Sequence, residues 1–107
     1  MKIQQQKNTL YLSELKELNA ANSGSFRDEV RAVLPEGLQT IEIDLSQTVF
    51  LDSCGLGALV ALYKTACSRS TSGPVTVRLL NPVPHVQQIF ELTRMHRLFE
   101  IVQTQNA

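Results

Sequence analysis

The stretch from Ile41 to Lys64, IEIDLSQTVFLDSCGLGALVALYK, decides the fold. Apolar and polar residues alternate from Ile41 to Leu45, which is the period of a half-buried strand. After residues 52–57 (DSCGLG) the apolar positions change to helical spacing and predict one helix face, formed by Leu56, Leu59, Val60, Tyr63 and Cys67. A strand that leads straight into a helix is typical of α/β proteins, in which helices connect parallel strands.

Ser53 lies where the predicted strand turns into the predicted helix. Backbone N–H groups at a helix N-terminus favour anions, so a serine there is well placed to receive or hold a phosphate. The plainer interpretation is that Asp52 and Ser53 are ordinary helix N-caps. Gly55 and Gly57 weigh against a helix selected only for stability, because glycine costs up to about 1 kcal/mol relative to alanine. We interpret both glycines as a flat surface that another backbone can approach closely.

The rest of the chain continues the alternation of strands and helices. Strands are expected at residues 9–12, 40–45 and 75–79, with a weak one near Ile3 and a last apolar stretch at 99–102. A helix capped by Ser23 or Ser25 should bury one stripe, formed by Phe26, Val30, Val33 and Leu34. Residues 69–74 read as a loop, another helix follows Pro84, and a helical turn is expected at 95–98.

This order predicts one α/β domain over residues 1–107, with a small sheet of about four to five mostly parallel strands. Strands covered by helices on both faces are usually apolar throughout, whereas 41–45 and 75–79 alternate. We therefore expect one sheet face to be polar and exposed. Right-handed crossovers that never reverse direction would place the helices mainly on the other face.

Composition excludes several classes of partner. The chain has 10 Lys and Arg against 10 Asp and Glu, so no basic excess marks it for nucleic acid or anionic lipid. We expect no membrane insertion and a cytoplasmic location, because no apolar stretch is long enough to span a bilayer and the N-terminus does not resemble a signal peptide.

The sequence gives little indication of a metal site, a redox site or an acid–base catalytic site. Cys54 and Cys67 would lie about 20 Å apart on one helix, too far for a disulfide, and the two histidines lack metal-ligand spacing. Cys54 could be a reactive thiol at a helix N-terminus, but a small side chain that only fills its position is favoured. Asp44 and Asp52 have no neighbouring base, so we expect no catalysis. Asp44 would either line the Ser53 region or end its strand.

Three stretches resemble the STAS domain family, specifically the stand-alone bacterial anti-sigma-factor antagonists. Residues 50–59 (FLDSCGLGAL) are close to the family's Asp-Ser-(small)-Gly-Leu-Gly segment. Residues 17–22 (ELNAAN) are similar to its Glu/Arg-Leu-Asp-Ala-Ala stretch. Residues 89–93 and 98–101 are like its closing helix and strand. The resemblance therefore covers nearly the whole chain and implies a STAS-like sheet.

The resemblance implies that Ser53 is phosphorylated by a partner serine kinase of the anti-sigma type, which supplies Mg-ATP, so no cofactor is expected here. The unphosphorylated antagonist would bind that kinase and free the sigma factor, and a PP2C-type phosphatase would reverse the modification. The surroundings of the phosphosite are then Asn19, Asp44, Asp52, Cys54, Gly55, Leu56 and Gly57.

The chain departs from the family pattern at two places. Asn19 stands where the family usually has Asp, which bears on phosphorylation. Arg94-Met95 stands where the family has Gly-Leu, which bears on the choice of partner.

Two other functions stay open. One is a STAS subunit permanently docked on an ATPase of a lipid-transport or stress-signalling assembly, with Ser53 only an interface serine. The other is a small-ligand or nucleotide-binding module, although the glycines match no Walker or dinucleotide fingerprint. The sequence also leaves open which sigma factor, kinase or phosphatase is involved, whether transcription is the output, and whether a weak homodimer forms.

Overall fold

A five-stranded sheet forms the centre of the computed structural model, which describes residues 1–70 and 73–103. Its strand order is β1-β2-β4-β6-β7. The strands are β1 (Lys2–Gln6), β2 (Thr9–Ser13), β4 (Thr40–Asp44), β6 (Thr76–Leu80) and β7 (Glu100–Val102). Only β1 and β2 pair antiparallel, as a hairpin, and the other neighbours are parallel. The predicted α/β fold with a small, mostly parallel sheet is confirmed.

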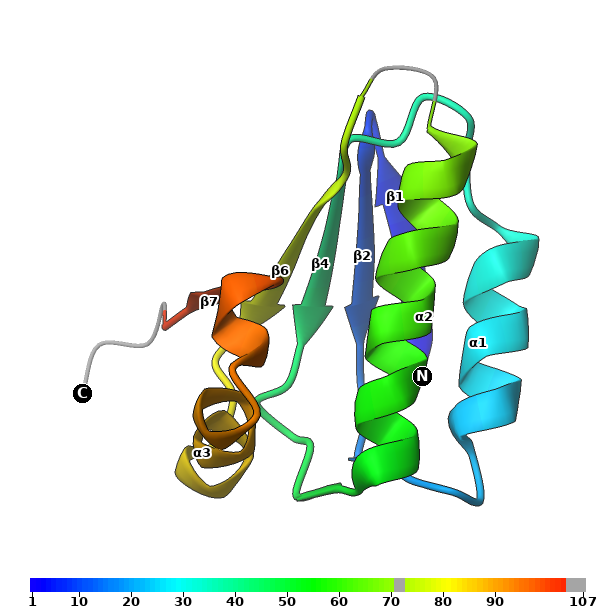
Figure 1. The fold of residues 1–107 in the computed structure, drawn as a ribbon. Helices are drawn as coiled ribbons and strands as arrows, with labels where there is room; N and C mark the ends of the chain where they lie inside the picture. The colour runs from blue at the N-terminus through cyan, green and yellow to red at the C-terminus, as the bar shows by residue number, and fades with distance from the viewer. Residues whose placement is uncertain (71–72, 104–107) are drawn as a thin grey trace.

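The helices lie on one face of this sheet (Figure 1). They are α1 (Ser23–Ala32), α2 (Ser53–Arg69), α3 (Pro84–Leu92) and the short 3-10 helix η1 (Met95–Arg97). The alternation in β4 explains the one-sided arrangement: Ile41 and Ile43 are fully buried, whereas Glu42 lies between them on the other face. On that open face Arg78 pairs with Glu42 at 3.5 Å and with Glu100 at 3.4 Å. The predicted polar sheet face is therefore present.

A second, two-stranded sheet was not expected from the sequence. It pairs β3 (Glu17–Leu18) with β5 (Phe50–Leu51) in parallel. The N–H of Val49 also donates to the Lys16 carbonyl at 2.9 Å. Strands of two residues are too short to show a period of two, so no pattern announces them. They hold the polar passage before α1 against the segment that leads into α2.

The start and end of α1 differ from the expectation. Neither Ser23 nor Ser25 caps the helix, because Ser23 is already its first residue and Asn22 is the N-cap. The Asn22 side chain makes no cap hydrogen bond to the helix and instead accepts the Asn19 N–H at 2.8 Å. At the other end Phe26 and Val30 are buried, but Val33 follows the helix and is 44% exposed.

The buried face of α2 also differs from the predicted stripe. Leu59 is buried as expected, but the other deepest positions of the helix are Gly55, Ala58, Leu62 and Ala66. The remaining members of the stripe, Leu56, Val60, Tyr63 and Cys67, are only half-buried. Because α2 lies between α1 and α3 (Figure 1), its apolar positions face more than one neighbour. Small side chains then take the side of closest packing.

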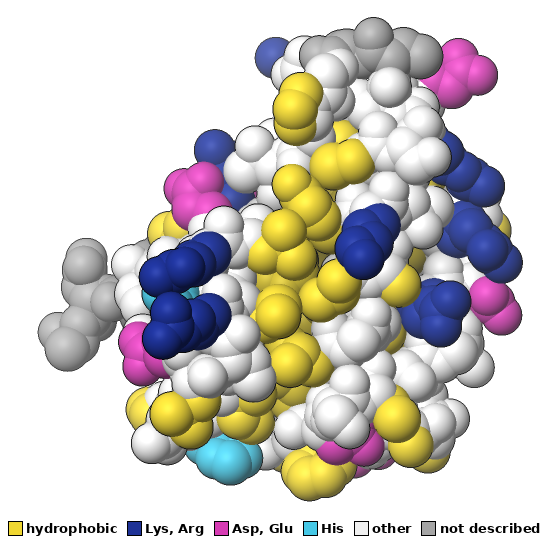
Figure 2. Space-filling view, in the orientation of Figure 1, with side chains coloured by type: hydrophobic (Ala, Val, Ile, Leu, Met, Phe, Trp, Pro, Cys, Tyr) yellow, Lys and Arg dark blue, Asp and Glu magenta, His cyan; other side chains and the backbone are white. Residues whose placement is uncertain are grey.

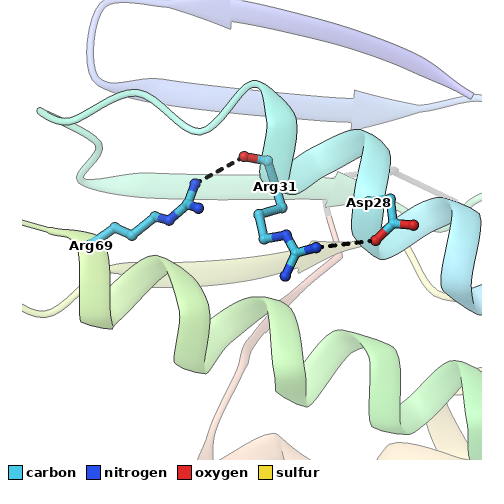
Figure 3. A network of polar contacts seen from close by, with 3 residues as sticks. All are labelled: Asp28, Arg31 and Arg69. Carbon is cyan, nitrogen blue, oxygen red and sulfur yellow. Dashed lines mark hydrogen bonds and ion pairs between the residues drawn. The ribbon is translucent and has the colours of Figure 1, made fainter.

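The C-terminal ends of α1 and α2 are joined by Arg69 (Figure 3). Its guanidinium donates to the backbone carbonyl of Arg31 at 3.0 Å, and the Arg31 side chain pairs with Asp28 at 3.4 Å. The exposed Arg31–Asp28 pair adds little stability, whereas a cation on a terminal helix carbonyl satisfies an acceptor that has no partner within the helix.

Residues 71–72 of the predicted loop lie outside the described residues. No helix described here has the length and apolar character needed to cross a bilayer.

Candidate functional site

Ser53 is the first residue of α2, and its side chain is exposed. The residue before it, Asp52, is the N-cap: its carboxylate accepts the Gly55 N–H at 2.9 Å. The structure thus separates two roles that the sequence left combined. Asp52 caps the helix, and the Ser53 hydroxyl stays on the surface, where another protein can reach it.

The Asp52 carboxylate also holds the passage before α1. Its second oxygen accepts the N–H of Ala20 at 3.0 Å. Asn19 therefore lies close to the start of α2, as the resemblance implied. The Asn19 side-chain oxygen accepts the Ala21 N–H at 2.9 Å, and its backbone carbonyl accepts the Ser23 N–H at 2.8 Å. An amide oxygen makes this turn as a carboxylate would, so Asn in place of Asp removes a charge and keeps the turn.

Gly55 is packed against the domain's own backbone. A Cβ at this position would lie 2.1 Å from the Leu18 carbonyl oxygen and 2.9 Å from the Leu51 Cδ1. Another backbone does approach Gly55 closely, as interpreted from the sequence, but it is that of β3 in the same domain. Gly55 is buried, so it is not part of a flat exposed surface. Gly57 is different: it is exposed, and a Cβ there would meet nothing within 4 Å.

The segment before Ser53 exposes two large apolar side chains, Val49 just before β5 and Phe50 at its start. Val49 is 69% exposed and Phe50 is 47% exposed. The preceding residue, Thr48, anchors this segment: it is fully buried and donates its hydroxyl proton to the Leu15 carbonyl. Figure 2 shows hydrophobic side chains at the surface at the end of the molecule where α2 begins. Exposed apolar side chains beside a reachable hydroxyl form a surface suited to binding a protein.

Two other residues predicted to surround Ser53 follow it in the first turn of α2. Cys54 is exposed next to it, and Leu56 is half-buried against the core. Neither cysteine is in a disulfide: Cys54 and Cys67 are both free. Across residues 1–70 and 73–103, no three metal-ligating side chains of the His, Cys, Asp and Glu types come together.

Asp44 belongs to a different environment. It is the last residue of β4 and lies on the open sheet face, opposite to the buried Ile43. Its carboxylate accepts the N–H of Ser46 at 2.9 Å and the hydroxyl of Tyr11 at 3.5 Å. Partial burial raises the pKa of Tyr11, and the negative charge of Asp44 raises it further. Of the two roles considered for Asp44, these contacts match the residue that ends its strand.

The model of the STAS domain family matches residues 1–107. The chain belongs to the STAS domain family. Among solved structures, this STAS domain is similar to the proposed anti-sigma factor antagonist TM1081 from Thermotoga maritima, at 27% identity and a TM-score of 0.81. That match covers 97% of this chain and 86% of the other. No curated protein sequence matches significantly.

Two further neighbours support the fold of the STAS domain. The anti-sigma factor antagonist SpoIIAA, which is a Bacillus protein, is 19% identical in its unphosphorylated form, with a TM-score of 0.78 and coverage of 98% and 88%. An anti-sigma factor antagonist from Mycobacterium paratuberculosis is 18% identical, with a TM-score of 0.72 and coverage of 94% and 81%. At these identities the likeness establishes a SpoIIAA-like fold and not a shared site.

The two contacts of Asp52 predict a pH dependence of the STAS domain's stability. The N–H of Gly55 is the main cause that lowers the pKa of Asp52 below its ordinary value of 3.8, and the N–H of Ala20 also contributes. A carboxyl whose pKa is lower in the folded state stabilises the fold above its unfolded pKa, and this contribution is lost as pH falls through the folded pKa.

We therefore expect Asp52→Asn to lower the Tm at pH 7, because an amide can accept only one of the two N–H groups. The difference from the wild type should shrink as pH falls below 3.8 and the wild-type carboxyl is protonated. Thermal unfolding followed by circular dichroism across this range measures the effect. A Tm difference that stays constant with pH would show that the charge of Asp52 does not contribute.

Proposed function

We propose that this STAS domain is an anti-sigma-factor antagonist that is switched off by phosphorylation of Ser53. The observation that carries the proposal is the exposed Ser53 at the first position of α2, beside the outward-facing Val49 and Phe50. Membership of the STAS family and the likeness to antagonist structures support the same class of partner. The protein would act in the cytoplasm as a binding partner without catalytic activity.

The partners of the proposal follow from the chemistry of the switch. A serine kinase of the anti-sigma type would bind the unphosphorylated surface, supply Mg-ATP and transfer phosphate to the Ser53 hydroxyl. Release of the kinase would then stop the antagonist from freeing a sigma factor. A PP2C-type phosphatase would restore the hydroxyl and complete the partner-switching cycle.

The position of Ser53 explains how a phosphate could switch binding without refolding the domain. Phosphoserine adds about −1.5 to −2 charges. At the N-terminus of α2 the helix dipole tolerates a negative charge, so the fold should change little. At an interface the same charge, next to Asp52 and two apolar side chains, has to be desolvated beside a like charge, which opposes binding.

Mass spectrometry after incubation with an anti-sigma kinase and Mg-ATP tests the proposal. We expect one phosphate on Ser53 and none on Ser53→Ala. Ser25→Ala is a matched control, because Ser25 is also exposed in the first turn of a helix, and it should be phosphorylated like the wild type. Full modification of Ser53→Ala would end the proposal.

Permanent docking on an ATPase is the second candidate, and Val49 and Phe50 favour it too, because a lasting interface also needs exposed apolar side chains. Co-purification separates the two functions. A permanent subunit would co-purify with its ATPase, and the complex would stay intact after incubation with Mg-ATP. The proposed antagonist would instead dissociate from its kinase once Ser53 carries phosphate.

A further inference from the structure

A groove of about 470 Å³ lies between α2 and the C-terminal part of the chain, away from Ser53. Six of the residues that line it are Tyr63, Val75, His96, Arg97, Leu98 and Phe99. Figure 2 shows a band of hydrophobic side chains in this region, between α2 and the elements α3 and η1.

The floor of the groove is apolar and firmly packed. Val75 and Phe99 are buried, and the rings of Phe99 and Tyr63 meet edge to face with centroids 6.2 Å apart. Tyr63 and Leu98 are half-buried, so each leaves part of its apolar surface open to solvent. The exposed apolar surface is thus part of the groove lining.

Positive charge lies in and beside the groove. The exposed Arg97 lines the groove itself. Two more exposed cations are next to its lining in the chain: Arg94 directly precedes η1, and Lys64 directly follows Tyr63 in α2. None of these three side chains has an ion-pair or hydrogen-bond partner among the described residues. The carboxylate of the lining, Glu100, is already paired with Arg78 at 3.4 Å. Figure 2 shows Lys and Arg side chains on both sides of the hydrophobic band.

Arg94 also has a backbone conformation that favours glycine. Its φ is 60° and its ψ is 23°, in the left-handed region that residues with a Cβ seldom adopt. Residues held in such conformations often serve a function that outweighs the strain. At this position a glycine would satisfy the turn and lose the guanidinium. The strain therefore supports a use for the positive charge beside the groove.

We propose that this groove binds an acidic amphipathic segment of a partner protein, with its apolar side chains in the groove and its carboxylates against Lys64, Arg94 and Arg97. A helix laid in an apolar groove with charged edges is a common mode of peptide recognition. A lipid surface fits less well, because membrane binding needs apolar side chains that protrude into the bilayer. The groove shares no lining residue with the surface around Ser53, so it would serve a second contact.

Fluorescence anisotropy with the 107-residue chain tests the proposal. The probe is a fluorescein-labelled helical peptide of about 18 residues with leucines on one face and glutamates on both flanks. We expect a Kd of about 100 µM or tighter at low ionic strength. The double variant Arg94→Gly/Arg97→Gln should weaken binding at least about tenfold. Arg27→Gln, an exposed charge on α1 outside the groove, should leave it unchanged.

Two readouts make the result unambiguous. Arg94→Gly alone should have a Tm equal to or above the wild type, because it relieves the left-handed backbone, so weaker binding cannot be ascribed to unfolding. Amide NMR shifts on adding the peptide should centre on Lys64 and residues 94–99. Absence of binding, shifts centred on residues 49–53, or anionic vesicles that compete for the groove would each overturn the proposal.

Discussion

Gly55→Ala is expected to lower the free energy of unfolding by about 2–3 kcal/mol. The added Cβ would lie 2.1 Å from the carbonyl oxygen and 2.7 Å from the carbonyl carbon of Leu18. These are backbone atoms, and Leu18 is held in place by its pairing with Leu51. The clash cannot be relieved by rotating a side chain, so β3 and the start of α2 would have to separate.

Gly57→Ala is the matched control two residues later. Its Cβ would meet nothing within 4 Å, and the position is exposed. Because alanine is a better helix former, we expect a gain of up to about 1 kcal/mol. Urea unfolding followed by circular dichroism compares both variants with the wild type. If the two substitutions had equal effects, the close approach of β3 to α2 would be refuted.

The second large effect is expected for Ser53→Asp. This variant should weaken kinase binding at least about tenfold while leaving the Tm nearly unchanged. The negative side chain would stand at the N-terminus of α2, where the helix dipole favours it, so the fold is not strained. In the complex it would lie at the interface beside Asp52, where like charges repel.

Isothermal titration calorimetry with the kinase measures the affinity, and thermal unfolding measures the stability. Ser25→Asp is the control, since it adds the same charge to the exposed first turn of α1 and should bind like the wild type. Equal affinities of wild type and Ser53→Asp would count against the switch. If the kinase instead phosphorylated Ser53 without losing affinity, permanent docking would become the better account.

The local patterns of the sequence predicted the elements well. Ile41 and Ile43 alternate with polar residues, and this period indicated both the β4 strand and the face that it buries. Pro84 predicted the start of α3, of which it is the first residue. The resemblance of residues 50–59 to STAS domains anticipated a family that the whole-chain match establishes. Such signals are local, because a strand or helix repeats its buried positions within a few residues.

Patterns were less informative where burial depends on neighbours. Val33 continues the apolar spacing of α1 and is nevertheless 44% exposed, since the helix ends before it. In α2 the apolar residues surround much of the helix, so periodicity could not tell Leu62, which is buried, from Tyr63, which is half-buried. Which side packs most closely depends on where α1 and α3 lie.

The sequence by itself determined the order of the helices and of the strands in the five-stranded sheet, the one-sided arrangement of the helices and the serine at the start of α2. Only the tertiary structure decided what surrounds that serine. In the folded chain the N–H of Ala20 donates to the Asp52 carboxylate, and Gly55 packs against the Leu18 carbonyl. Asp44 lies on the open face of the sheet, where it accepts the Tyr11 hydroxyl. The physical reason is that each of these contacts joins segments that are far apart in the chain. Such segments come close to each other only when the sheet and the helices pack together.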